Sequence, residues 1–98
     1  MNYNLIISSR AEKKIDILLT FLLEEWGIST QQSFLDEFQH CLFIIKQNPY
    51  TFPATLQNTE VRQCVITSLS KLFYTIQGDD ILILSLEDVR MDPNKMIF

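Results

Sequence analysis

The side chains best suited to chemistry in this chain are few: one histidine, His40, and two cysteines, Cys41 and Cys64. Neither cysteine has a second cysteine or histidine at the spacing of a metal-ligand set, and the Gly-Asp-Asp segment at residues 78–80 is typical of a turn. His40 falls on or near the apolar stripe of a predicted helix, and both cysteines lie in apolar patterns typical of reduced core thiols. We therefore expect no metal site and no cofactor.

A basic cluster at the start of the first predicted helix is a second candidate site. It consists of Arg10, Lys13 and Lys14, while Glu24 and Glu25 lie near the end of the same helix. Both placements oppose the helix dipole, by roughly 0.3–1 kcal/mol per charge. Two interpretations stay open: the charges lie on a solvated face and pair with other side chains, or the cluster binds an acidic partner.

Composition predicts one domain, residues 1–98, because 98 residues are too few for two cores. Hydrophobic residues make up 47% of the chain and the net charge is −4, so a packed core is expected and direct nucleic-acid binding is not. The first eight residues lack the positive start and long apolar run of a targeting signal. No apolar run is long enough to span a membrane, so we expect a cytoplasmic protein without membrane contact.

The first half of the chain predicts a short strand and then a helix. Residues 3–8 are short and apolar, as in a strand. Ser9 with Glu12 three residues later forms a capping-box pattern, and apolar residues then recur at helical spacing. Because Gly27 offers a left-handed stop, the sequence predicts a helix over residues 10–26.

A second helix is predicted directly after the first. Ser29 with Gln32 repeats the capping-box pattern, and an Asn-Pro pair at residues 48–49 ends the periodicity. Only residues 27–28 separate the two helices, so we expect them to fold back as an antiparallel hairpin. Residues 50–60 contain a proline and are predicted to be a loop.

The second half of the chain predicts a sheet. Residues 61–90 contain three runs rich in β-branched and aromatic residues, with turn signals between them, which indicates two successive β-hairpins. The third run, residues 81–86, is apolar at nearly every position, so we expect it to be covered on both faces. The predicted fold class is α+β: an antiparallel sheet in the order β-α-α-β-β-β, covered by an antiparallel helical hairpin.

Seven short motifs are spread along nearly the whole chain, and their order is more specific than any one motif. The motifs are Ser9-Arg10-Ala11-Glu12, Glu24-Glu25-Trp26-Gly27, Asn48-Pro49, Val61-Arg62, Leu72-Phe73-Tyr74, Ile81-Leu82-Ile83-Leu84 and Asp88-Val89-Arg90. Together they resemble the RelE/ParE toxin superfamily. The resemblance implies a small α+β toxin of a type II toxin–antitoxin pair, silenced by an antitoxin protein. Members similar to ParE poison DNA gyrase, and members similar to RelE cut mRNA in the ribosomal A site.

The resemblance also supplies the candidate catalytic residues Arg62, Tyr74 and Arg90. The RelE-like pattern uses loop lysines, arginines on strands, and a tyrosine or histidine near the C-terminus. Here Arg62 and Arg90 fall where the arginines would, but residues 50–60 contain no lysine or arginine, and residues 91–98 contain no tyrosine or histidine. Cleavage through the 2′-hydroxyl needs a proton acceptor and cations around the phosphate, so this set is incomplete.

Each candidate also has a structural interpretation. Tyr74 shares a predicted strand face with Leu72 and Ile76, which is typical of a core tyrosine with its hydroxyl at the edge. Arg62 could pair with an acidic neighbour, and Arg90 follows an aspartate and could form a local salt bridge.

We therefore expect a protein-binding toxin, closer to ParE than to RelE, with an antitoxin as its partner and DNA gyrase as a possible target. The candidate antitoxin-binding residues are Arg10, Lys13, Lys14, Ile17 and Phe21, because the last two are apolar positions off the main helical stripe. Two alternatives stay open: a ribosome-dependent mRNA endonuclease with a reduced active site, and a non-toxic remnant that still binds an antitoxin.

Overall fold

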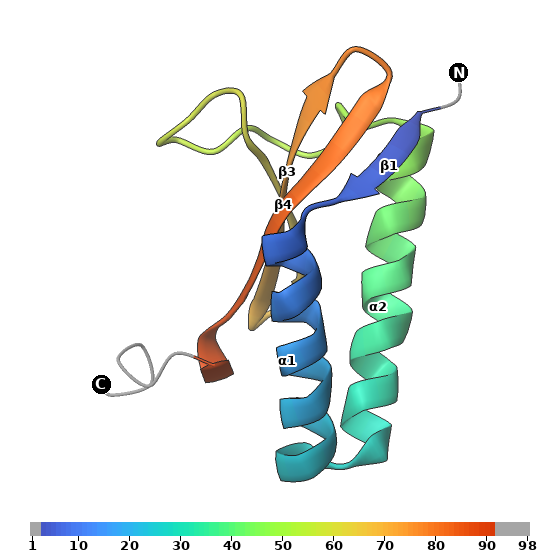
Figure 1. The fold of residues 1–98 in the computed structure, drawn as a ribbon, viewed down its shortest axis with the longest axis vertical. Helices are drawn as coiled ribbons and strands as arrows, with labels where there is room; N and C mark the ends of the chain where they lie inside the picture. The colour runs from blue at the N-terminus through green and yellow to red at the C-terminus, as the bar shows by residue number, and fades with distance from the viewer. Residues whose placement is uncertain (1–2, 92–98) are drawn as a thin grey trace.

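Two consecutive helices and four strands build the fold, and the computed structural model describes them over residues 3–91. In chain order they are β1 (Asn4–Ile7), α1 (Ser9–Trp26), α2 (Ile28–Gln47), β2 (Arg62–Thr67), β3 (Ser70–Gln77), β4 (Asp80–Asp88) and the 3-10 turn η1 (Val89–Met91). This is the predicted β-α-α-β-β-β order and an α+β fold (Figure 1).

The strands form one sheet in the order β1-β4-β3-β2. As predicted, β2, β3 and β4 form an antiparallel meander. The expectation of a wholly antiparallel sheet is wrong, because β1 pairs with β4 in parallel, Asn4 opposite Asp80 and Ile7 opposite Ile83. Apolar alternation indicates which side chains face a core, but it carries no information on the direction of a strand reached through two helices.

β4 is one of the two interior strands of the sheet and lies between β1 and β3. It is the one strand of the four with no exposed residue. Its side chains nevertheless alternate: Ile81 and Ile83 are fully buried, whereas Leu82 and Leu84 are only half-buried. The expectation of cover on both faces is therefore wrong.

The helices begin one residue earlier than the sequence predicted. Ser8, not Ser9, caps α1, and its hydroxyl oxygen accepts a hydrogen bond from the backbone N–H of Ala11 at 3.1 Å. Gly27, at a φ of 93°, ends α1 and also precedes the first residue of α2. Gly27 is the only residue between the two helices, and its left-handed φ explains why glycine is favoured at this position.

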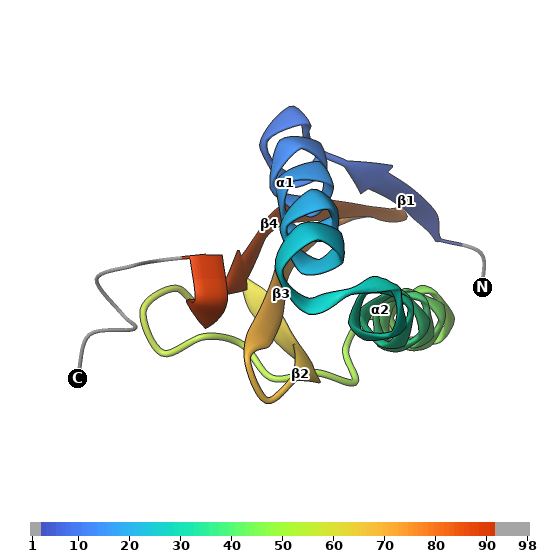
Figure 2. The same ribbon diagram turned by 90° about the horizontal axis from the view of Figure 1, so that it is seen from below.

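Both helices lie on the same face of the sheet, α1 against β4 and α2 against β2 (Figures 1 and 2). They run side by side in opposite directions, and the side chain of Gln31 donates to the backbone oxygen of Leu19 at 2.9 Å. The buried core between helices and sheet includes Leu18, Leu22, Phe34, Phe38, Ile45, Leu72, Tyr74, Ile81 and Ile83. Among the described residues, no helix is both long and apolar enough to cross a membrane.

The interior position of β4 makes a strong prediction for Ile83, whose side chain is fully buried. Ile83→Asp places an unpaired charge in the core, which costs several kcal/mol, comparable to the whole stability of a small domain. We expect the variant to lose cooperative thermal unfolding and to be recovered mainly as insoluble protein.

Val65→Asp is the matched control, because Val65 lies in the same sheet but is 58% exposed. It should fold and unfold like the wild type, within about 1 kcal/mol. A soluble, cooperatively unfolding Ile83→Asp variant would contradict the core assigned to β4.

Candidate functional site

One face of α1 combines basic and apolar side chains in a single stripe. Arg10, Lys14, Ile17 and Phe21 follow each other at spacings of four, three and four residues, which places them on one side of a helix. The side chain of Ile17 is 55% exposed, although isoleucine is usually buried. The stripe therefore presents positive charge near the start of α1 and an apolar surface toward its end.

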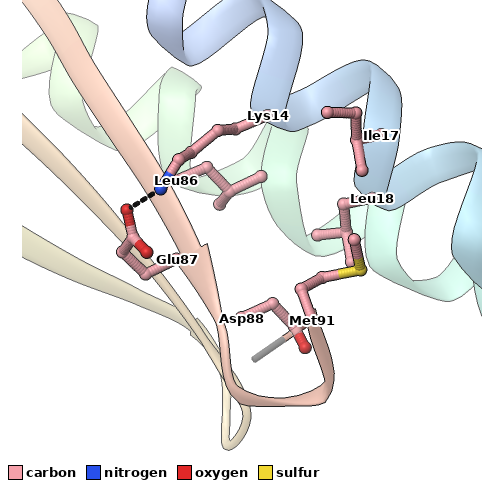
Figure 3. A pocket seen from close by; sticks show the side chains of 7 residues that line it. All are labelled: Lys14, Ile17, Leu18, Leu86, Glu87, Asp88 and Met91. Atoms are coloured by element: carbon pink, nitrogen blue, oxygen red, sulfur yellow. Dashed lines mark hydrogen bonds and ion pairs between the residues drawn. The ribbon is translucent and has the colours of Figure 1, made fainter. Parts of the chain in front are cut away.

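Two hollows lie beside this stripe, the first between α1 and the end of β4 and the second between α1 and η1. The first has a volume of about 350 Å³ and is lined by Lys14, Ile17, Leu18, Leu86, Glu87, Asp88 and Met91 (Figure 3). The second, of about 430 Å³, is lined by Asp16, Ile17, Thr20, Phe21, Glu24 and Met91. Since Ile17 and Met91 line both, the hollows form one groove along α1, which we call the α1 groove.

The sheet topology explains why the α1 groove exists. The parallel strand β1 pairs only with the first half of β4, from Asp80 to Ile83. Beyond that point, no strand among the described residues pairs with this side of β4. The second half of β4 therefore has an open edge next to α1, and the side chains of Leu86 and Glu87 reach the groove from it (Figure 3).

An ion pair crosses the mouth of the groove. Lys14 Nζ lies 2.5 Å from Glu87 Oε2, and the hydroxyl of Ser85 also donates to Glu87. Burial alone would raise the pKa of Glu87, but the hydrogen bonds from Lys14 and Ser85 and the charges of Lys14 and Arg10 outweigh it, so the pKa is lowered. Lys14 thus fits the interpretation that the cluster pairs with other side chains, whereas Arg10 and Lys13 are exposed.

At the floor of the groove, Asp88 is held by a buried network. The guanidinium of Arg90 donates two hydrogen bonds to the Asp88 carboxylate, from Nε to Oδ1 at 3.0 Å and from Nη2 to Oδ2 at 2.7 Å. The hydroxyl of Ser70 also donates to Oδ2. Burial raises the pKa of Asp88, but these hydrogen bonds from Arg90 and Ser70 outweigh it and lower the pKa. Arg90 therefore forms the local salt bridge that was its structural interpretation.

Arg62, the second candidate arginine, lies at the other edge of the sheet. Its Nη1 donates to the backbone oxygen of Phe52 at 2.5 Å and to that of Tyr50 at 3.4 Å. The guanidinium also lies over the ring of Tyr50, 5.1 Å from its centroid, in a cation–π contact. These contacts attach the 50–60 loop to β2. Among the described residues, Arg62 therefore does not pair with an acidic neighbour, which was its structural interpretation from the sequence.

Tyr74 is fully buried, and its hydroxyl donates to the backbone oxygen of Pro49 at 2.6 Å. Burial raises its pKa to about 12, against the lowering effect of the Arg62 charge. A general base works best when its pKa lies near the working pH, so this hydroxyl is poorly suited to accept a proton. The environment is that of a core tyrosine whose hydroxyl makes its hydrogen bond at the edge of the core.

The three candidate catalytic residues do not converge on one point. Arg62 and Tyr74 are direct partners in the β2–β3 ladder. Arg90 follows Asp88, which pairs with Ser70 at the opposite end of β3. Four strand positions separate Ser70 from Tyr74, roughly 13 Å along the strand. A catalytic role for these residues stays a prediction, and their contacts give each of them a structural role.

Sequence analysis found the helical wall of the α1 groove, Ile17 and Phe21, but missed the wall that β4 and η1 supply. Leu86, Glu87, Asp88 and Met91 read as an ordinary strand end, because the open edge of β4 depends on where the parallel strand β1 stops. The alternation of apolar Leu86 with charged Glu87 and Asp88 was the available signal.

Comparisons with known proteins give a match at the level of structure alone. No protein-family model matches the chain, and no curated protein matches it by sequence. A chromosomal ParDE toxin–antitoxin system from P. aeruginosa has a TM-score of 0.72 at 12% identity, covering 88% of this chain and 95% of that chain. The YoeB dimer from Staphylococcus aureus has a TM-score of 0.62 at 15% identity, covering 89% and 97%.

The DinJ-YafQ toxin–antitoxin complex from E. coli gives a TM-score of 0.65 at 7% identity, covering 95% of this chain and 99% of that chain. Each match spans nearly the full length of this chain and of the matched chain. The chain therefore has the fold of the RelE/ParE toxin superfamily, as the order of its motifs predicted.

The buried Asp88 makes the stability of the protein depend on acid. Its pKa is lowered in the folded chain, so its contribution is fully present above the ordinary value of 3.8 and is lost as the pH falls through the lower native pKa. Asp88→Asn removes the charge that Arg90 needs, and we expect a loss of about 3 kcal/mol at pH 7.

Urea unfolding at pH 7 and at stepwise lower pH measures both effects. The difference between wild type and Asp88→Asn should shrink as the pH drops below 3.8. A difference that stays constant down to the acid limit would show that the Asp88 charge does not stabilise the fold.

Proposed function

We propose that this protein is the toxin of a type II toxin–antitoxin pair and that its antitoxin binds in the α1 groove. The superfamily fold supports the class, since solved neighbours include toxins in complex with antitoxins, such as DinJ-YafQ. The observation that carries the proposal is the groove itself. It places an exposed isoleucine, Ile17, in the lining of two hollows whose walls combine apolar and charged side chains.

The lining of the groove suggests the chemistry of the partner. Two hollows in line would take apolar anchors spaced along an amphipathic segment, which is how helices bind grooves. Arg10 and Lys13 are exposed near one end of the groove and would attract acidic residues on that segment. The open edge of β4 adds backbone groups that an extended stretch of the partner could use.

A protein target fits the chain better than RNA cleavage does. Arg62, Tyr74 and Arg90 are each bonded within the fold, Arg62 and Tyr74 to backbone carbonyls and Arg90 to a buried carboxylate. Using them on a phosphate would leave those partners unsatisfied, at a cost of about 1–3 kcal/mol each. The sequence offers no loop lysine and no C-terminal histidine or tyrosine in their place.

The proposed mode of action is therefore ParE-like, through contact with a protein such as DNA gyrase. We propose that the target contact lies in the segment after Arg90, of which residues 92–98 lie outside the described part of the chain. An mRNA endonuclease with a reduced site and a non-toxic antitoxin-binding remnant remain as outcomes of the test.

Ile17→Asp tests the α1 groove directly. Ile17 is 55% exposed, so the substitution should leave the fold intact while it places a charge in both hollows. Loss of an interface anchor costs about 2 kcal/mol or more, roughly a 30-fold weaker complex. Calorimetric titration with the antitoxin encoded beside this gene measures the change.

Ile28→Asp is the matched control, because Ile28 is 63% exposed at the turn between the helices and lines neither hollow. It should bind the antitoxin like the wild type. Equal affinity of Ile17→Asp and Ile28→Asp would place the antitoxin elsewhere on the surface.

Charge reversal tests the basic end of the groove. Lys14 is a poor choice on its own, because its substitution also breaks the ion pair with Glu87. Lys13→Glu avoids that problem, and we expect a complex about 10-fold weaker at low salt, with the difference fading as salt is added. Lys46→Glu on α2 is the control for net charge. No difference between the two variants at low salt would exclude the basic cluster as a contact.

The mode of action is tested by adding purified protein to programmed ribosomes and, separately, to a gyrase supercoiling reaction. We expect inhibition of supercoiling and intact mRNA. Cleaved mRNA that disappears with Arg62→Ala or Arg90→Ala would establish the endonuclease instead. No effect in either assay, with antitoxin binding retained, would identify the non-toxic remnant.

A further inference from the structure

The two cysteines, far apart in sequence, meet between α2 and β2. Cys41 Sγ lies 3.7 Å from the backbone oxygen of Val65, and Cys64 Sγ lies 3.8 Å from the same oxygen. The two thiols are thus close enough for each to shift the pKa of the other. Both are free cysteines and both are buried, so the fold brings two reduced thiols to the same backbone oxygen in the core.

The two thiols have different environments, which gives them different chemistry. The side-chain interaction between them lowers the pKa of Cys41 and raises the pKa of Cys64, with burial opposing the first shift and adding to the second. Cys41 is 5% exposed and Cys64 is fully enclosed. Cys41 is thus the thiol that an oxidant in solution meets first, and it is also the one that ionises more readily.

We propose that Cys41 and Cys64 form an oxidisable pair that closes into a disulfide between α2 and β2. A hydroperoxide is the oxidant class that suits the narrow access. The sulfur of Cys41 attacks a peroxide oxygen, the O–O bond breaks, and Cys41 becomes a sulfenic acid as water leaves. The sulfur of Cys64 then attacks the Cys41 sulfur, the S–O bond breaks, and a second water leaves. Two thiols lose two electrons and two protons, and hydrogen peroxide is reduced to two waters.

The bond would act on the stability of the fold and leave the α1 groove alone. It fastens α2 to β2, whereas the groove is formed by α1, β4 and η1. The closed loop runs from residue 41 to residue 64 and contains the whole 50–60 segment, so the unfolded chain loses much of its freedom. The oxidised protein should therefore resist unfolding without a change in the partner-binding surface. This inference is independent of the proposed function.

The test oxidises the purified full-length protein with a stoichiometric amount of hydrogen peroxide, then unfolds and alkylates it before mass spectrometry. We expect a monomer that lacks two hydrogen atoms and takes up no alkyl group, with the crosslinked peptides mapping to Cys41 and Cys64. Dithiothreitol should restore both thiols. The oxidised protein should melt about 10 °C above the reduced protein.

Cys64→Ser is the control, because it keeps the more accessible thiol and removes its partner. After the same treatment Cys41 should carry a sulfenic acid or a bond to a second chain, with no internal crosslink. Wild-type protein that still takes up two alkyl groups, or that crosslinks only between chains, would overturn the proposal. So would an internal disulfide that lowers the melting temperature, because that bond would not fit the folded arrangement of α2 and β2.

Discussion

The fold depends on the packing of β4 against α1. Ile81 and Ile83 of β4 are fully buried, and they belong to the same buried cluster as Leu18 and Leu22 of α1. Burial of a large aliphatic side chain is worth about 1.5–3 kcal/mol, so these four residues alone contribute a large share of a small domain's stability. Every other strand is positioned through β4, by direct pairing or through β3.

Within the described residues, the edge of β4 that faces β1 is paired over its first half only, and the unpaired second half carries side chains that line the α1 groove. The parallel strand β1 is short and stops opposite Ile83. The open second half of β4 then presents Glu87 to Lys14, which offsets part of the unfavourable placement of positive charge at the start of α1. Asp88, two residues after Leu86, is buried and links Arg90 to Ser70 at the start of β3. One strand end thus supplies both an ion pair at the groove mouth and the anchor for η1.

Sequence patterns predicted the elements well, because apolar periodicity and turn residues act locally. The helices and the meander follow from apolar spacings of two, three or four residues and from the turn residues between them. The direction of β1, the open edge of β4 and the meeting of Cys41 with Cys64 depend on how distant segments dock, and no local pattern encodes that. The shift of the helix cap from Ser9 to Ser8 has another cause: both serines can cap, and the end of β1 decides which one has the extended backbone that a cap requires.

The same contacts separate binding from catalysis in this fold. Residues that could stabilise a phosphate are satisfied internally: Arg62 holds the 50–60 loop through Phe52, and Tyr74 holds Pro49. Releasing Arg62 or Tyr74 from these carbonyl oxygens would weaken the fold. Binding a phosphate with them would also not accelerate a reaction if the substrate and the transition state were bound equally well. Ile17 is in the opposite situation, because its exposed apolar surface gains free energy only when something covers it. Ile17 differs from other exposed apolar residues such as Phe43 and Val65 because it also lines both hollows of the α1 groove.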